Sequence, residues 1–169
     1  TIYTTDVTCS GISNGSASAT VSGGTPPFTY IWKDGAVTVA TGSVSVFGLA
    51  GSTSYSFTVI DDNGCSSSKS FVILEPVTVV SAIISDTNVS CFGLCDGSAT
   101  VGAAGGDLPY TYNWSTSPVQ NSPSASGLCM GTYNVAVYDS NGCLSTSSVT
   151  IAQPAAIVIS PMVDSVKCN

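Results

Sequence analysis

Cysteine has the widest chemical range of the residue types in this chain, because a thiol can form a disulfide, bind a metal ion or act as a nucleophile. The 169 residues include seven cysteines and no histidine. Zinc sites normally combine close Cys pairs or recruit His, and the one close pair here, Cys91 and Cys95, has no second pair and no His to complete it. We therefore expect disulfides formed in an oxidising compartment, with metal binding as the weaker alternative. The odd count leads us to expect that at least one cysteine has its partner outside this sequence.

The chain lacks the residues that enzymatic acid-base chemistry usually needs. It has no His, its single Glu is Glu75, and its Asp residues fall mostly at predicted turns. Ser and Thr are abundant, but none can be activated by a His base. The sequence therefore predicts a protein that is not an enzyme.

Calcium is the one cofactor for which hard oxygen ligands are available. Asp61, Asp62 and Asn63 stand together before a Gly, and calcium stiffens many extracellular modules. The equivalent position to Asp62 later in the chain is Ser140, and neither stretch has the spaced acidic loop of a dedicated site. We predict a type I′ hairpin turn at Asn63-Gly64 and no cofactor, and keep calcium binding as an alternative.

The charge balance excludes several classes of partner. Only 8% of the residues are charged and the net charge is −7, with Lys33, Lys69 and Lys167 as the only cations. Nucleic acid and anionic membrane surfaces repel such a chain. The sequence contains no run of about 18 apolar residues, so we do not expect membrane insertion. The first residue is Thr1 and no leader-like segment follows it, so we expect an internal piece of a longer protein.

A tandem repeat organises the chain. Residues 23–32 (GGTPPFTYIW) recur as residues 105–114 (GGDLPYTYNW), and each copy places a Gly-Gly-Pro turn before an aromatic strand that ends in Trp32 or Trp114. These are the only two Trp, so each is predicted to be the central core residue of its own copy. We expect one domain at 1–76, a second at 77–154, and the start of a third repeat at 155–169.

Strand and turn signals every eight to twelve residues, without a helical stretch, predict the fold. Each copy has six or seven short strands of alternating pattern, including residues 55–60 and 133–138. We predict an all-β chain of tandem immunoglobulin-like antiparallel β-sandwich domains. Tyr55 and Tyr133 open the penultimate strands, where a sandwich often uses the Tyr hydroxyl to hold the preceding loop; the alternative is an ordinary half-buried Tyr.

Exposed aromatic side chains would indicate carbohydrate binding, which is the alternative from a different functional class. Period two places Phe28, Tyr30 and Trp32 on one face of their strand, so most of this group is predicted to be core. The candidates for a sugar-binding surface are Phe28, Tyr30, Tyr110, Tyr112 and Tyr138.

Five landmarks recur in fixed order in both copies. They are D-V-T-C or N-V-S-C, then N-G-S or D-G-S, then G-G-x-x-P-aromatic-T-Y-x-W, then G-L, then D-x-N-G-C. This pattern resembles the SprB repeat family, whose repeats occur in very long cell-surface adhesins of gliding Bacteroidota exported by type IX secretion. The first copy departs from the second by a longer segment between Trp32 and Leu49. The resemblance implies a secreted, filamentous, non-catalytic adhesin module at the cell surface, acting in attachment and gliding, whose partners are neighbouring repeats and, as a further expectation, surface polysaccharide.

The repeat also predicts disulfides. Cys95 and Cys129 occur only in the second copy, where the first has Ser13 and Ala50, and such a joint change is expected of a bonded pair. For the shared cysteines the simplest pattern is within copies, Cys9 with Cys65 and Cys91 with Cys143. Two other patterns remain open: Cys65 with Cys91 together with Cys143 with Cys168, or Cys9 with Cys143 as a staple between neighbours.

A final candidate is a modification site. The stretch Asp164-Ser165-Val166 resembles a short acceptor for O-linked glycans in Bacteroidota, so Ser165 is a candidate for glycosylation. The alternative is an ordinary strand Ser.

Overall fold

The computed structural model describes residues 1–160, and all of their regular structure is β-strand. The described chain therefore contains no helix that could cross a membrane. Ser165 and Cys168 lie outside the described residues. The strands form four sheets, two from the first repeat and two from the second.

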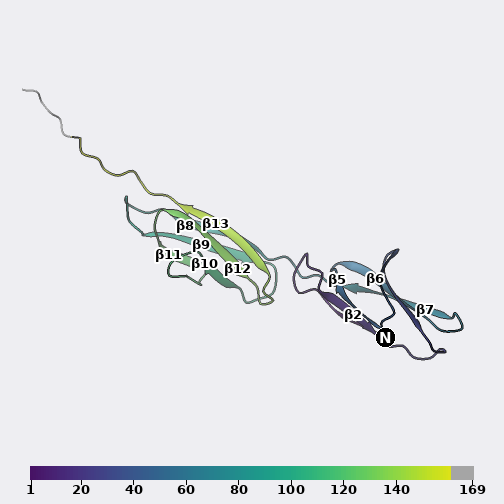
Figure 1. Ribbon diagram of the computed structural model, residues 1–169. Helices are drawn as coiled ribbons and strands as arrows, with labels where there is room; N and C mark the ends of the chain where they lie inside the picture. The colour runs from purple at the N-terminus through teal and green to yellow at the C-terminus, as the bar shows by residue number, and fades with distance from the viewer. Residues whose placement is uncertain (161–169) are drawn as a thin grey trace, which may run out of the picture. The chain divides into compact units, whose positions relative to one another are not determined.

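The first repeat folds as a seven-stranded sandwich (Figure 1). One sheet has the order β1-β2-β5 and the other the order β4-β3-β6-β7. Every strand pair of these two sheets is antiparallel. The strands are β1 (Ile2–Thr5), β2 (Gly15–Ala19), β3 (Thr29–Asp34), β4 (Val37–Thr41), β5 (Ser45–Leu49), β6 (Thr53–Ile60) and β7 (Ser66–Ile73).

The second repeat folds as a six-stranded sandwich with the same plan. Its sheets have the orders β11-β9-β8 and β10-β12-β13, so it lacks a counterpart of β4. The strands are β8 (Val80–Thr87), β9 (Gly97–Ala104), β10 (Thr111–Trp114), β11 (Ser124–Leu128), β12 (Gly131–Tyr138) and β13 (Leu144–Ile151). The prediction of an all-β, immunoglobulin-like fold is confirmed in both repeats.

Two compact units emerge from the contacts within the chain. The first contains residues 1–80 together with two loops of the second repeat, residues 104–110 and 138–145. The second contains residues 81–103, 111–137 and the chain from Thr146 onward. Each unit is described by itself below.

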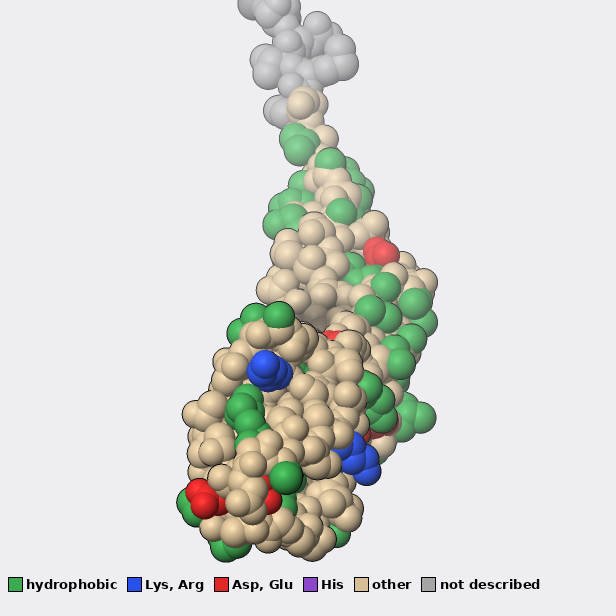
Figure 2. Space-filling view, turned by 90° about the vertical axis from the view of Figure 1, so that its right-hand side faces the viewer, with side chains coloured by type: hydrophobic (Ala, Val, Ile, Leu, Met, Phe, Trp, Pro, Cys, Tyr) green, Lys and Arg blue, Asp and Glu red, His purple; other side chains and the backbone are tan. Residues whose placement is uncertain are grey.

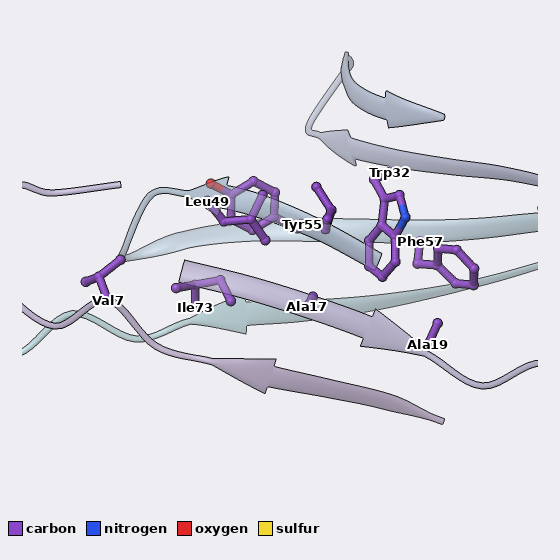
Figure 3. Packing of buried hydrophobic residues seen from close by; sticks show 9 residues of the cluster. Val7, Ala17, Ala19, Trp32, Leu49, Tyr55, Phe57 and Ile73 are labelled. Atoms are coloured by element: carbon purple, nitrogen blue, oxygen red, sulfur yellow. The ribbon is translucent and has the colours of Figure 1, made fainter. Parts of the chain in front are cut away.

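Alternating burial builds the core of the first repeat. In β2 the pattern brings Ala17 and Ala19 inward, and β3 and β6 contribute Trp32, Tyr55 and Phe57. These side chains meet between the two sheets, together with residues from the neighbouring strands and loops: Val7, Val46, Leu49 and Ile73 (Figure 3). Trp32 and its counterpart Trp114 are both 0% exposed, which confirms their predicted core positions. The indole N–H of each donates to a backbone carbonyl, so the burial of Trp leaves no polar group unpaired.

The glycine of the N-G-S and D-G-S landmarks has a packing role. A Cβ at Gly15 would stand 2.7 Å from Cγ2 of Ile73, and a Cβ at Gly97 would stand 2.8 Å from Cγ2 of Ile151. Because real Cβ contacts are longer, only Gly lets β2 and β9 begin this close to the last strand of their sandwich. The landmark therefore marks a close approach of the two sheets.

The surface is largely uncharged. Figure 2 shows a face covered mostly by polar uncharged side chains and backbone, with few red or blue groups. This agrees with a charged fraction of only 8%.

Candidate functional site

The strongest chemical feature of the described chain is a disulfide between Cys9 and Cys143. The two Cα atoms are 5.5 Å apart, within the usual range for this bond. Cys9 follows β1 and Cys143 precedes β13, and both lie within the first compact unit. In the sequence, however, Cys9 belongs to the first repeat and Cys143 to the second, so the bond links the repeats covalently.

This bond corrects the pairing within copies, Cys9 with Cys65 and Cys91 with Cys143. In the sandwich of the first repeat, Cys9 lies beyond the end of β1 that pairs with the start of β2, whereas Cys65 lies in the turn between β6 and β7. The backbone N–H of Val7, two residues before Cys9, donates to the carbonyl of Leu74, which directly follows the last residue of β7. Cys65 lies just before the first residue of that strand. The two cysteines of one copy therefore lie at opposite ends of one strand and cannot bond. Cys65 and Cys91 instead carry free, exposed thiols.

A second disulfide joins Cys95 to Cys129, the pair indicated by their joint absence from the first repeat. Cys95 lies just before β9 and Cys129 just after β11, and these two strands are hydrogen-bonded neighbours. Gly97 pairs with Leu128, which brings the cysteines to the same end of the sheet. The bond closes a loop within the second unit.

The D-x-N-G-C landmark is a turn organised by its Asp. Asp61 Oδ1 accepts the N–H groups of Asn63 at 3.1 Å and Cys65 at 2.8 Å, and Oδ2 accepts the N–H of Thr25 at 3.1 Å. The N–H of Thr25 is the largest cause that lowers the pKa of Asp61 below its ordinary value of 3.8. These donors use both carboxylate oxygens for turn formation.

Asp139 repeats this arrangement in the second copy. Its Oδ1 accepts the N–H groups of Asn141 and Cys143, both at 2.9 Å, and its Oδ2 accepts the N–H of Asp107 at 3.1 Å. Burial acts most strongly and raises the pKa of Asp139, but the backbone donors together outweigh it, and the net pKa is lowered from 3.8. Asp139 is 4% exposed and the only buried charged residue of the described chain.

The predicted type I′ turn at Asn63-Gly64 is wrong. Gly64 has a φ of +80°, but Asn63 has no positive φ, and a type I′ turn needs both. The N–H of Gly64 donates to the carbonyl of Asp61, and the N–H of Asp61 donates to the carbonyl of Cys65. This is a type I turn followed by a left-handed Gly, which the Asp side chain favours by taking the central N–H groups.

A second side-chain clamp fixes the loop that carries the first cysteine of each copy. Glu75 Oε1 accepts the hydroxyl of Ser10 at 2.8 Å and the N–H of Gly11 at 2.5 Å, and the N–H of Gly11 is the main cause that lowers the pKa of Glu75. In the second copy, Gln153 Oε1 accepts the N–H of Gly93 at 3.1 Å. The same loop is therefore held by the same position in both copies.

The predicted Tyr contacts are present in both copies and differ in strength. The Tyr55 hydroxyl accepts the N–H of Ala50 at 2.9 Å and donates to its carbonyl at 3.3 Å, and Tyr55 is buried. The Tyr133 hydroxyl donates to the carbonyl of Cys129 at 3.2 Å and Tyr133 is half-buried. Each Tyr thus holds the loop before its strand.

The aromatic candidates for sugar binding do not form an exposed platform. Each is half-buried, namely Phe28, Tyr30, Tyr110, Tyr112 and Tyr138. The Tyr30 ring stacks on Phe57 at 6.0 Å, and the Tyr110 hydroxyl donates to the carbonyl of Gly105 at 2.6 Å. In residues 1–160 no three His, Cys, Asp or Glu side chains are grouped so as to hold a metal ion.

Comparison with known proteins identifies the repeats. The family model of the SprB repeat matches residues 1–37 and 84–119, the opening part of each copy. Both copies therefore match the SprB repeat family. No protein of curated function matches the sequence.

Two solved structures of β-sandwich proteins are similar in outline. The fibronectin(III)-like modules of Clostridium thermocellum CbhA are 15% identical, with a TM-score of 0.40 over 90% of this chain and 94% of that one. The amphioxus IgVJ-C2 molecule is 14% identical, with a TM-score of 0.34 over 90% and 96%. The immunoglobulin-like fold of both repeats rests on the strand order given above. Two SprB repeats with two disulfides support a structural, extracellular repeat module.

Sequence reasoning overlooked the segment that joins the repeats. Val79 is 5% exposed, and the N–H of Gly106 donates to the carbonyl of Val77 at 2.9 Å, so this segment packs against the Gly-Gly loop. The signal was present in the sequence, because an apolar residue stands three positions after the Pro in both copies: Val79 after Pro76, and Ile157 after Pro154.

Proposed function

We propose that this chain is a non-catalytic structural stretch of a long, secreted cell-surface adhesin filament that serves attachment and gliding. The observation that carries the proposal is the Cys9–Cys143 disulfide, which spans 134 positions of sequence and links two SprB repeats. A bond of this span closes most of the chain into one covalent loop. A filament under tension is the setting in which such a loop has a mechanical effect.

The disulfide changes how the chain transmits tension. A pull on the two ends passes from residues 1–9 directly to residues 143–169 through the sulfur atoms. The residues between Cys9 and Cys143 bear no load while the bond is intact. The strands between the two cysteines, β2 to β12, are therefore protected from being pulled apart, whereas β1 and β13 remain on the loaded path.

The sparse charge and the disulfides support placement outside the cell. Disulfides persist in oxidising compartments, and the described chain holds two. With a net charge of −7 the module has no affinity for anionic surfaces, so its partners are proposed to be neighbouring repeats of the same protein, with adhesion to polysaccharide located elsewhere along the filament.

The proposal is tested in the host organism. An antibody raised against residues 1–160 should label intact cells, and protease added to intact cells should remove the signal. Deletion of the gene should reduce surface attachment and gliding speed. Labelling only after permeabilisation, or a deletion strain that attaches and glides like its parent, would contradict the proposed function.

A further inference from the structure

The bonded cysteines and the free cysteines occupy the same two positions of the repeat. Cys9 is the first cysteine of its copy, and Cys143 is the cysteine that ends the D-x-N-G-C turn. Cys91 is the first cysteine of the second copy, and Cys65 ends the turn of the first copy. Among the described residues, one cysteine at each of the two positions is bonded, Cys9 with Cys143, and the other cysteine at each position, Cys91 or Cys65, is free.

The turn around Cys65 is already built as the turn around the bonded Cys143 is. The Asp side chain accepts the N–H of the cysteine at 2.8 Å in the first copy and 2.9 Å in the second. In both copies the N–H after the Asp donates to the loop that follows the Gly-Gly pair, from Asp62 to Thr25 and from Ser140 to Asp107. Cys65 therefore needs no rearrangement of its turn to bond.

The loop around Cys91 likewise matches the loop around the bonded Cys9. The N–H of Ile12 donates to the carbonyl of Cys9 at 3.4 Å, and the N–H of Leu94 donates to the carbonyl of Cys91 at 3.2 Å. Glu75 and Gln153 hold the two loops from the same position, as described above. Both cysteines are thus presented on loops of the same construction.

The turn of the second copy shows what lies beside a bonded cysteine. Here the buried Val79 and the carboxylate of Asp139 both lie against Gly106, and the Gly105-Gly106 backbone leaves no room for side chains. A Cβ on Gly105 would collide with the carbonyl of Thr78, and one on Gly106 would collide with Val79. The two glycines thus form a seat for residues 77–79, which directly precede the first strand of this sandwich.

The equivalent seat in the first copy is open. A hollow of about 180 Å³ is lined by Gly23, Gly24, Phe28, Asp61 and Cys65, among others. Gly24 is the counterpart of Gly106, against which Val79 lies in the second copy, and Asp61 is the counterpart of Asp139 beside it. Among the described residues no acceptor meets the N–H of Gly24, whereas its counterpart Gly106 donates to Val77.

The complementary segment is exposed at the other end of the described chain. Ile157 is the counterpart of Val79, and it is 97% exposed where Val79 is 5% exposed. A second hollow beside Cys91 is lined by Phe92, Pro154 and Ile157. An apolar segment therefore lies beside the cysteine here, as Val77 and Val79 lie beside the bonded cysteines Cys9 and Cys143.

We propose that Cys65 and Cys91 each form a disulfide with a cysteine of a further SprB repeat. Cys65 bonds to the first cysteine of a preceding repeat, and the residues that join that repeat to Thr1 fill the hollow at Gly24. Cys91 bonds to the turn cysteine of a following repeat. Each bond forms as two thiols lose two protons and two electrons to a disulfide oxidant, such as glutathione disulfide, which leaves as two glutathione thiols.

The proposal rests on the proposed function, because it requires further repeats in the same chain, but it is tested with purified protein. Residues 1–82 are placed directly before Thr1 of the full chain, which keeps the 82-residue spacing between Cys9 and Cys91. The added copy carries Cys65→Ser, so that the extended chain has only the Cys65 of the original sequence. After refolding in reduced and oxidised glutathione, peptide mapping without reductant should link Cys9 of the added copy to Cys65. Iodoacetamide should label Cys65 fully in the original chain and at least tenfold less in the extended chain.

A shorter extension separates the seat from the disulfide. Only residues 76–82 are placed before Thr1, which supplies a Val79 but no cysteine. Amide hydrogen exchange at Gly24 should slow at least tenfold, and Val79→Asp in the added segment should reverse this, while Cys65 stays open to iodoacetamide. The Cys9→Ser variant of the added copy in the long extension should restore labelling of Cys65 without loss of the β-sheet circular dichroism signal.

A Cys65 that stays labelled in the long extension, or that bonds to a cysteine other than Cys9 of the added copy, would overturn the proposal. Unchanged exchange at Gly24 in the short extension would overturn the seat. Neither result bears on whether the protein lies at the cell surface, so a failure here is distinguishable from a failure of the proposed function.

Discussion

The two repeats share one strand plan but stabilise it differently. In the first, aromatic rings fill the space between the sheets: Trp32 lies 4.3 Å from Phe57 and 5.7 Å from Phe71, measured between ring centroids. In the second, Val135 and Val149 stand at the positions of these two Phe residues, and the buried Val46 is replaced by Ala125. The second core therefore has smaller side chains at these three positions, although it has the larger Val101 where the first has Ala19.

The second repeat carries a disulfide where its core is reduced. The bond between Cys95 and Cys129 closes a loop of 34 positions, which the chain-entropy model values at about 4 kcal/mol. A buried Phe contributes about 2 kcal/mol more than a buried Val, so two such losses are of the same size. A small sandwich can therefore exchange aromatic core volume for a cross-link and retain its topology.

The largest expected effect is the loss of the disulfide that is specific to the second repeat. The double variant Cys95→Ala, Cys129→Ala should destabilise the second repeat by about 4 kcal/mol, because its unfolded state regains loop entropy. Hydrogen exchange of peptides from β9 and β12 would measure this loss. Peptides from β2 and β6 should change little, and equal destabilisation of both repeats would contradict the compensation described here.

A smaller effect is expected when the first core is made to resemble the second. Phe57→Val removes ring contacts with Trp32 and Tyr30 and should cost about 2 kcal/mol in the free energy of unfolding. Chemical denaturation, monitored by hydrogen exchange of peptides from β6, would measure this loss of stability. Val135→Phe is the matched control and should also destabilise, because Val135 is 1% exposed and a larger ring at a buried site must displace its surroundings. A stabilising Val135→Phe would show that the second core is underpacked.

The two Tyr hydroxyls should separate the repeats further. Tyr55→Phe removes both hydrogen bonds to Ala50 from a buried site and should cost about 1 kcal/mol. Tyr133→Phe should cost less than about 0.5 kcal/mol, because its one bond goes to Cys129, which the disulfide already holds. Thermal unfolding of the two variants in parallel tests this, and equal losses would show that the disulfide does not relieve Tyr133 of its role.

The smallest difference between the repeats is expected in their response to acid. Asp61 and Asp139 both have a folded pKa below 3.8, so each stabilises its turn above that pH, and the contribution is lost as the pH falls through the folded value. Stability should therefore be flat near neutrality and should fall below about pH 4. Asp61→Asn and Asp139→Asn should each flatten the fall below pH 4, which denaturation midpoints between pH 2 and pH 7 would show; an unchanged fall in both variants would contradict this role.

Much of the fold could be predicted from local patterns in the sequence, but the Cys9–Cys143 disulfide could not. Alternation placed Trp32 and Trp114 in the core, and the joint change at Cys95 and Cys129 pointed to their bond because it is a comparison between copies. The partner of Cys9 could not be found in this way, because both candidates, Cys65 and Cys143, stand at the same position of the repeat. Choosing between them requires knowing at which end of the sandwich each turn lies, which depends on tertiary structure.

The predicted type I′ turn at Asn63-Gly64 was wrong for a different reason. Asn-Gly after an alternating strand favours a type I′ turn when only the two central residues are considered. Here Asp61 takes the N–H groups of Asn63 and Cys65 with its side chain, and this stabilises the longer turn. A side chain outside the two central positions decided the backbone conformation.

The Cys9–Cys143 disulfide should shield strands β2 to β12 from tension, and single-molecule stretching between the two chain ends tests this directly. With the disulfide intact, only the eight residues before Cys9 and the 26 after Cys143 can extend, which gives about 120 Å at 3.6 Å per residue. After reduction, all 169 residues can extend, to about 600 Å. An oxidised chain that reaches the same full length as the reduced chain would contradict the claim.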